Sequence, residues 1–89
     1  MARFLVQAEH TEADCVQALD SVVAFSQALL ARFDWGCKDG EHVGWAVVEA
    51  QDKATARMLV PTYLRGKTRV VALNKFTPED VSSFHAGGQ

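Results

Sequence analysis

Residues 43–60, VGWAVVEAQDKATARMLV, contain a strand signal that runs directly into a helix signal. The segment 43–50 is almost unbroken in apolar residues and rich in β-branched and aromatic side chains, which predicts a central strand. Asp52 then offers a carboxylate to the free N–H groups of a first helical turn, and a helix is predicted over 53–60. Pro61 ends it, because proline lacks the N–H that a helix interior needs.

The same strand-then-helix pattern occurs at the start of the chain. Residues 3–9 alternate in polarity, which predicts a strand. Thr11 is a suitable N-cap, and acidic residues follow it in the first turn, where negative charge meets the positive end of a helix. Apolar residues then recur at helical spacing without glycine or proline, so one helix is expected from about residue 12 to about residue 31.

The rest of the chain supplies two further strands, a hairpin turn and a short final helix. Asp39-Gly40 is the strongest turn signal, and Thr77 followed by Pro78 is typical of a helix start. The predicted elements are a strand over 33–38, a hairpin loop over 38–42, a turn over 62–64, a strand over 68–75 and a helix over 78–84.

The resulting order, βαββαβ plus a terminal helix, predicts an α+β fold. With right-handed crossovers it gives a ferredoxin-like sandwich, in which a four-stranded antiparallel sheet carries two helices on one face. The first and third strands, which are the most apolar, are expected to be central. One domain is predicted over 1–85, followed by a flexible tail over 86–89.

Composition excludes several classes of function. The chain has 89 residues and a net charge of −2, with a pI of about 5.8, so it lacks the basic field that binds nucleic acids or acidic membranes. No apolar run approaches the roughly 20 residues that span a bilayer, and the first residues become polar too early for a signal peptide. Cys15 and Cys37 suggest reduced thiols, and a cytoplasmic location is expected.

The sheet face away from the helices is expected to be amphipathic. It is too apolar to remain in water and too polar to form a sealed core, so it should meet a partner or a ligand. Its predicted side chains are those of Leu5, Gln7, Glu9, Trp45, Val47 and Glu49, together with Val71 and Leu73 or, if the register of the last strand is shifted by one residue, their neighbours.

Three segments carry a resemblance to a known family: residues 4–8, residues 44–52 and the closing 77–80. In these the chain resembles the small ferredoxin-like domains of the dimeric α/β-barrel superfamily, including GYD-type domains. The resemblance implies a homodimer whose sheets pack face to face. Some members of that superfamily are cofactor-free monooxygenases, isomerases or haem-degrading proteins, but no catalytic residue of theirs is matched here, and a shared fold does not give a shared function.

A few residues could serve a site. His10, at the junction of the first strand and helix, is the weak catalytic candidate, because imidazole titrates nearest neutrality. Trp35 and Trp45 could wall an apolar pocket or stack on a planar ligand. Arg65 and Arg69 could hold an anionic ligand, since guanidinium groups suit carboxylate and phosphate.

No metal site and no cofactor are expected. No second histidine lies at ligand spacing from His10, and the charged hairpin around His42 is more typical of a solvated loop. Cys37 beside Lys38 could be an activated thiol, but a small strand residue is the preferred interpretation.

The sequence therefore leaves the function open. The preferred interpretation is a small homodimeric domain that binds a small molecule or a protein partner through the open sheet face. The alternative is a cofactor-free enzyme of the dimeric α/β-barrel kind that acts on an apolar aromatic substrate near His10. RNA binding is disfavoured, because the strands lack the paired exposed aromatics on which bases stack.

Overall fold

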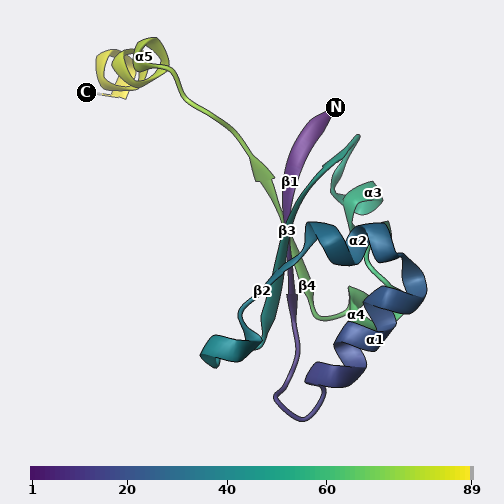
Figure 1. Ribbon diagram of the computed structural model, residues 1–89. Coiled ribbons are helices and arrows are strands. Elements are labelled where there is room, and N and C mark those ends of the chain that lie inside the picture. Colours follow the sequence, from purple (N-terminus) through teal and green to yellow (C-terminus); the bar gives the residue numbers. More distant parts are fainter. Residues whose placement is uncertain (89) are drawn as a thin grey trace.

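A four-stranded antiparallel sheet forms the centre of the computed structural model, which describes residues 1–88 (Figure 1). Its strands are β1 (Ala2–Glu9), β2 (Asp34–Trp35), β3 (Val43–Ala50) and β4 (Thr68–Leu73). Their spatial order is β2-β3-β1-β4, so the prediction that the first and third strands are central is confirmed, as is the α+β class.

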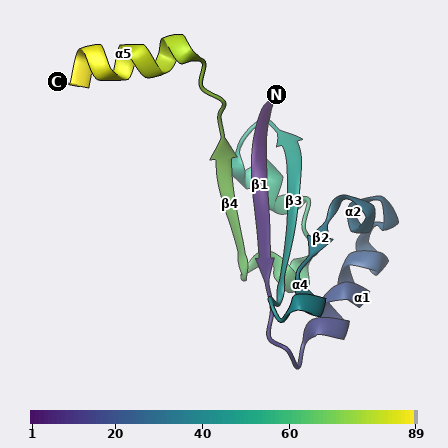
Figure 2. The ribbon, with the colours of Figure 1, turned by 60° about the vertical axis from the view of Figure 1, so that its left-hand side comes forward.

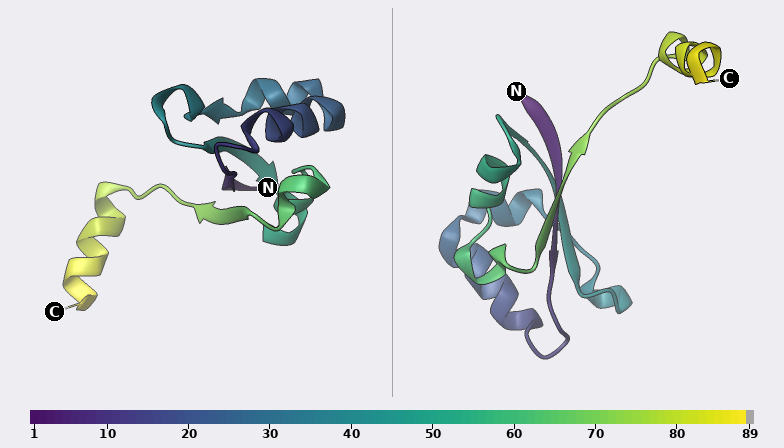
Figure 3. Two further views of the ribbon diagram at one scale, coloured as in Figure 1. Left: turned by 90° about the horizontal axis from the view of Figure 1, so that it is seen from below. Right: turned by 180° about the vertical axis from the view of Figure 1, so that it is seen from behind.

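Four short helices cover one face of this sheet (Figures 1 and 3). They are α1 (Cys15–Phe25), α2 (Gln27–Arg32), α3 (Lys53–Met58) and α4 (Thr62–Arg65), and a short 3₁₀ helix, η1 (Cys37–Asp39), lies between β2 and β3. A fifth helix, α5 (Pro78–Gly88), stands away from the sheet at the end of a short connection (Figure 2). None of the described helices combines the length and apolar composition needed to cross a membrane.

The prediction of one continuous helix over 12–31 is wrong, because Ser26 interrupts it. Ser26 has extended backbone angles, with φ −170° and ψ 123°. Its N–H still donates to the Val22 carbonyl at 2.8 Å, while its Oγ accepts from the Leu29 N–H at 3.1 Å. One residue thus ends α1 and caps α2, a use of serine that competes with an uninterrupted helix.

Other boundaries also differ from the predictions. The second strand is two residues long instead of spanning 33–38, because the chain turns at Gly36 into η1. Helix α5 begins at the predicted residue, where Thr77 and Asp80 cap each other through reciprocal hydrogen bonds of 2.9 and 3.1 Å. It continues past residue 84 to Gly88, through most of the predicted tail, and Gln89 lies outside the described residues.

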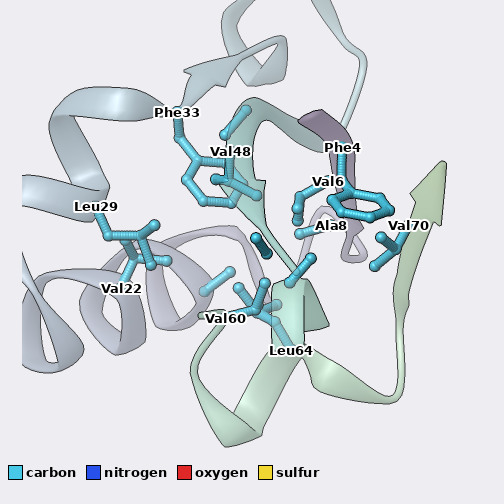
Figure 4. Close-up of a cluster of buried hydrophobic side chains, with 14 residues drawn as sticks. Phe4, Val6, Ala8, Val22, Leu29, Phe33, Val48, Val60, Leu64 and Val70 are labelled. Atoms are coloured by element: carbon cyan, nitrogen blue, oxygen red, sulfur yellow. The ribbon is translucent and has the colours of Figure 1, made fainter. Parts of the chain in front are cut away.

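The core lies between the sheet and α1–α4 (Figure 4). Alternate residues of β1 and β3 point into it, as a strand period of two requires. The largest side chains with no significant exposure are Val6, Val22, Val60 and Leu64. Burying each such side chain contributes about 1.5–3 kcal/mol, so this layer is the main source of stability.

The opposite face of the sheet is open, and its occupants are those that the sequence predicts. Leu5 lies across from Val47 of β3 on one side and from Val71 of β4 on the other. We call the apolar part of this surface the open sheet face; it consists of Leu5, Trp45, Val47, Val71 and Leu73. Val47, near its middle, is 48% exposed, and the other four residues are partly buried by their neighbours in the sheet. The helices α1–α4 lie on the other face.

Candidate metal centre

His10 directly follows β1 and His42 directly precedes β3, and these two residues continue the pairing of the central strands. Glu9 of β1 lies opposite Val43 of β3, and beyond this pair the His10 N–H donates to the His42 carbonyl at 3.1 Å. Because side chains alternate along a strand, His10 falls on the same face as the buried Ala8. Both imidazoles therefore lie at the end of the sheet on its helix-covered side, with ring centroids 5.7 Å apart.

Two turns bring a cysteine to each histidine. After His10 the chain reverses through a turn in which the Asp14 N–H donates to Thr11 Oγ1 at 3.2 Å, and Cys15 begins α1. Cys37 begins η1, and Gly40 then brings the chain back to β3 with φ +84°, which glycine adopts without strain. Both turns lie at the lower end of the sheet in Figure 2.

The four side chains form one cluster. Ligand atoms of His10, Cys15, Cys37 and His42 all lie within 4.8 Å of one another, and Cys37 Sγ is 3.3 Å from His10 Nε2. In a tetrahedral zinc site with Zn–S near 2.3 Å and Zn–N near 2.0–2.1 Å, the ligand atoms are about 3.3–3.8 Å apart. The widest pair of the cluster needs to contract by about 1–1.5 Å to reach that geometry.

Burial changes the protonation of two of the four side chains. Burial, and after it the neighbouring His42, lowers the pKa of His10, which keeps this ring neutral and able to donate a lone pair at pH 7. Burial and the hydrogen bond with Cys15 raise the pKa of Cys37, so this group holds its proton until a metal displaces it. The buried Nδ1 atoms of both histidines have no hydrogen-bond partner among the described residues.

The aromatic rings of Phe33 and Trp35 lie beside the cluster. Trp35 stacks on Phe33 with a centroid distance of 5.2 Å, and its ring lies 6.0 Å from that of His10. Trp35 also packs directly on Gly44, where a Cβ would lie 2.7 Å from the indole. The glycine thus lets the indole approach the β3 backbone, next to His42, and this packing restricts where the histidine rings can lie.

The two predicted tryptophans lie on opposite faces of the sheet. Trp35 pairs with Gly44 and faces the helices, whereas Trp45 pairs with Asp34 and belongs to the open sheet face. They cannot wall one pocket, and a ligand at either one alone stays a prediction. Trp45 contributes to a hollow of about 290 Å³ on the open sheet face, which Leu5, Val47 and Arg32 also line.

The two predicted arginines do not converge either. Arg65 donates from Nε to the Val60 carbonyl at 2.8 Å and from Nη2 to the Met58 carbonyl at 3.2 Å, so its guanidinium covers the end of α3. Arg69 is exposed on β4 opposite Gln7, on the side of the sheet away from the helices. No anion site shared by the two guanidinium groups is formed.

His10 also borders an open hollow of about 440 Å³ beside the cluster. The other residues that line this hollow are Glu9, Thr11, Gly66, Lys67, Thr68 and Arg69. Its charge is mixed, because Glu9 lines it together with Lys67 and Arg69, and Lys67 Nζ is 3.8 Å from an Asp14 carboxylate oxygen. Neither tryptophan lines the hollow, although more of its exposed lining is apolar than polar. An enzyme that acts on an apolar aromatic substrate beside His10 stays a prediction.

Taken one at a time, His10 and His42 predict no metal site. The signal that could have found the cluster is the mirrored spacing His10-x₄-Cys15 and Cys37-x₄-His42. Each pair supplies only two donors, which is half a tetrahedral set. The two halves combine only if the first and third strands are neighbours in a register that places position 10 beside position 42.

Comparisons with protein-family models, with curated proteins and with solved structures found no match. The resemblance to the dimeric α/β-barrel superfamily therefore stays a prediction, and the geometry of the cluster is the basis for a functional proposal.

Proposed function

We propose that this protein is a zinc-binding domain in which His10, Cys15, Cys37 and His42 are the ligands. The proposal rests on one observation, the convergence of four donor atoms within 4.8 Å from two turns that are distant in the sequence. Two thiolates and two imidazoles in a compact set bind zinc in preference to magnesium, calcium or manganese, which favour oxygen ligands.

Four protein ligands would complete the coordination of the metal. Catalytic zinc sites keep one position for water or substrate, so this set favours a structural role. The zinc would join the end of β1, the start of α1 and the β2–β3 turn. An 89-residue domain buries a limited core, and metal binding is a frequent source of additional stability in domains of this size.

The topology, the oligomeric state and the location are part of the same proposal. The element order and the central position of β1 and β3 support a ferredoxin-like sandwich. A homodimer that binds a partner or small molecule remains our proposal for the biological context, supported by the apolar open sheet face. Thiolate ligands remain available to zinc in a reducing compartment, which supports a cytoplasmic location.

Metal content and metal spectroscopy test the proposal. The full chain, purified under reducing conditions without a histidine tag, should carry one zinc per chain by elemental mass spectrometry. Replacement of zinc by Co²⁺ should give the visible absorption of a tetrahedral ion together with a thiolate-to-metal charge-transfer band. Cys15→Ser and Cys37→Ser should each lose stoichiometric zinc and should halve the charge-transfer intensity of any residual Co²⁺ complex.

His85→Ala is the matched control, since it removes an imidazole that lies on α5 and outside the cluster. It should keep one zinc per chain, whereas His42→Ala should not. Circular dichroism of every variant, with and without zinc, separates loss of a ligand from loss of the fold. A folded native chain that takes up no stoichiometric zinc or Co²⁺ would exclude the proposed function.

A further inference from the structure

The C-terminal segment 74–88, which we call the arm, exposes an apolar surface of its own. Phe76 and Phe84 contact each other edge to face, with ring centroids 5.4 Å apart. Even so, Phe76 is 63% exposed, Phe84 is 58% exposed and the neighbouring Val81 is 44% exposed. Every residue from position 74 to position 85 is exposed, so this part of the arm gains almost no burial from the rest of the chain.

The dimensions of the molecule show how much surface the arm leaves uncovered. The radius of gyration is 16.0 Å, whereas a compact domain of this length has about 12 Å. The accessible surface is 6080 Å² for 9.8 kDa, about 900 Å² above the value expected for a compact monomer of this mass. A standard protein–protein interface buries about 800 Å² on each partner. The excess area of one chain therefore matches what one side of a stable dimer buries.

The same chain also carries a surface that suits the arm. The open sheet face presents Leu5, Val47 and Val71 side by side on adjacent strands. The hollow of about 290 Å³ beside Trp45 lies on this face and can receive an aromatic ring. In Figures 1 and 2 the arm leaves the end of β4 and extends away from its own sheet.

We infer that this protein forms a twofold homodimer in which each arm packs across the open sheet face of the other copy. This arrangement rests on the homodimer proposed above, names what covers its open sheet face, and uses residues other than the zinc ligands. One chain supplies both the apolar arm and the apolar face, so two identical chains can exchange arms in a closed, self-complementary pair. The aromatic side chains of the arm are the anchors, and the hollow beside Trp45 receives one of them.

Substitution on each side of this interface tests the inference. Phe84→Ser on the arm and Val47→Glu on the sheet should each weaken the dimer about 10-fold or more in sedimentation equilibrium, because each changes a central apolar contact. Met58→Glu is the matched control: Met58 is 58% exposed on α3, on the other side of the sheet, and its substitution should leave the dimer intact. A native chain that remains monomeric throughout the micromolar range would overturn the inference.

A cross-link then decides which surfaces meet. A photoreactive benzoylphenylalanine at position 84 is introduced into full-length ¹⁵N-labelled chain, which is mixed with unlabelled native chain and irradiated. Mixed-isotope products joined to the peptides of β1, β3 or β4 support arm exchange. Products within one chain only, or joined to the peptides of α1–α4, overturn it. Zinc content is measured on the same samples, so loss of the dimer and loss of the metal are distinguished.

Discussion

Gly44→Ala tests whether the packing of Trp35 on β3 holds the histidine pair in place. A Cβ at position 44 would lie 2.7 Å from Cζ3 and 2.8 Å from Cε3 of Trp35. Packed carbon atoms are about 3.5–4.0 Å apart, so the indole has to retreat by about 0.8 Å. Phe33 Cδ2 also lies 3.0 Å from this Cβ, and the indole has Phe33 and His10 as neighbours, so the ring has little room on that side. Overpacking of this kind costs about 1–3 kcal/mol.

Urea unfolding of the zinc-bound chain, followed by circular dichroism, measures this cost. Trp35→Leu in the same chain removes the two closest contacts and leaves the one with Phe33, so the double variant should recover about 1 kcal/mol relative to additivity. Gly66→Ala is the control, because a Cβ there meets nothing within 4 Å and the φ of −71° suits any residue. The reasoning is refuted if Gly44→Ala is no less stable than Gly66→Ala.

Three further changes have defined outcomes. Ser26→Ala removes the cap that accepts the Leu29 N–H and should cost about 1 kcal/mol in urea unfolding, with no change in zinc content. Leu64→Ala empties a fully buried position under β1 and should cost about 2–5 kcal/mol; a loss below 1 kcal/mol would contradict the described core. The hydrogen bond from the Thr55 N–H lowers the pKa of Asp52, so its stabilisation of α3 is present at neutral pH and lost as the pH falls below about 4. Asp52→Asn should therefore reduce the fall of the melting temperature between about pH 5 and pH 2, relative to the native chain.

The sequence predicted the sheet well, because two of its strands carry strong and independent signals. The alternation in β1 and the apolar run of β3 are local properties, and together they give the central pair and the occupants of the open sheet face. The break at Ser26 is not predicted, because the pattern of apolar residues does not reveal it. The apolar spacing continues through that position, and only the competing hydrogen bond of the serine side chain ends one helix and starts the next.

The candidate metal centre was harder to predict because it depends on strand register. The two histidines are 32 positions apart in the sequence, and a slip of one residue would turn one of them to the open face. The preference for a solvated loop around His42 was reasonable for an isolated hairpin. The structure gives a different interpretation. The His10 N–H donates to the His42 carbonyl, and this backbone pairing places both rings on one side of the sheet.

The dependence on register couples the metal to the fold. Neither His10 with Cys15 nor Cys37 with His42 can complete a tetrahedral set, so tight binding requires β1 and β3 to be paired. A ligand that binds only the folded state stabilises it by RT ln(1 + [L]/Kd), about 2.7 kcal/mol at 100 times Kd. This is a large part of the margin of about 5–15 kcal/mol that domains have in total. A single copy of this 89-residue chain, with its sheet face uncovered, should lie near the lower end of that margin, so the sheet and the zinc are each expected to depend on the other.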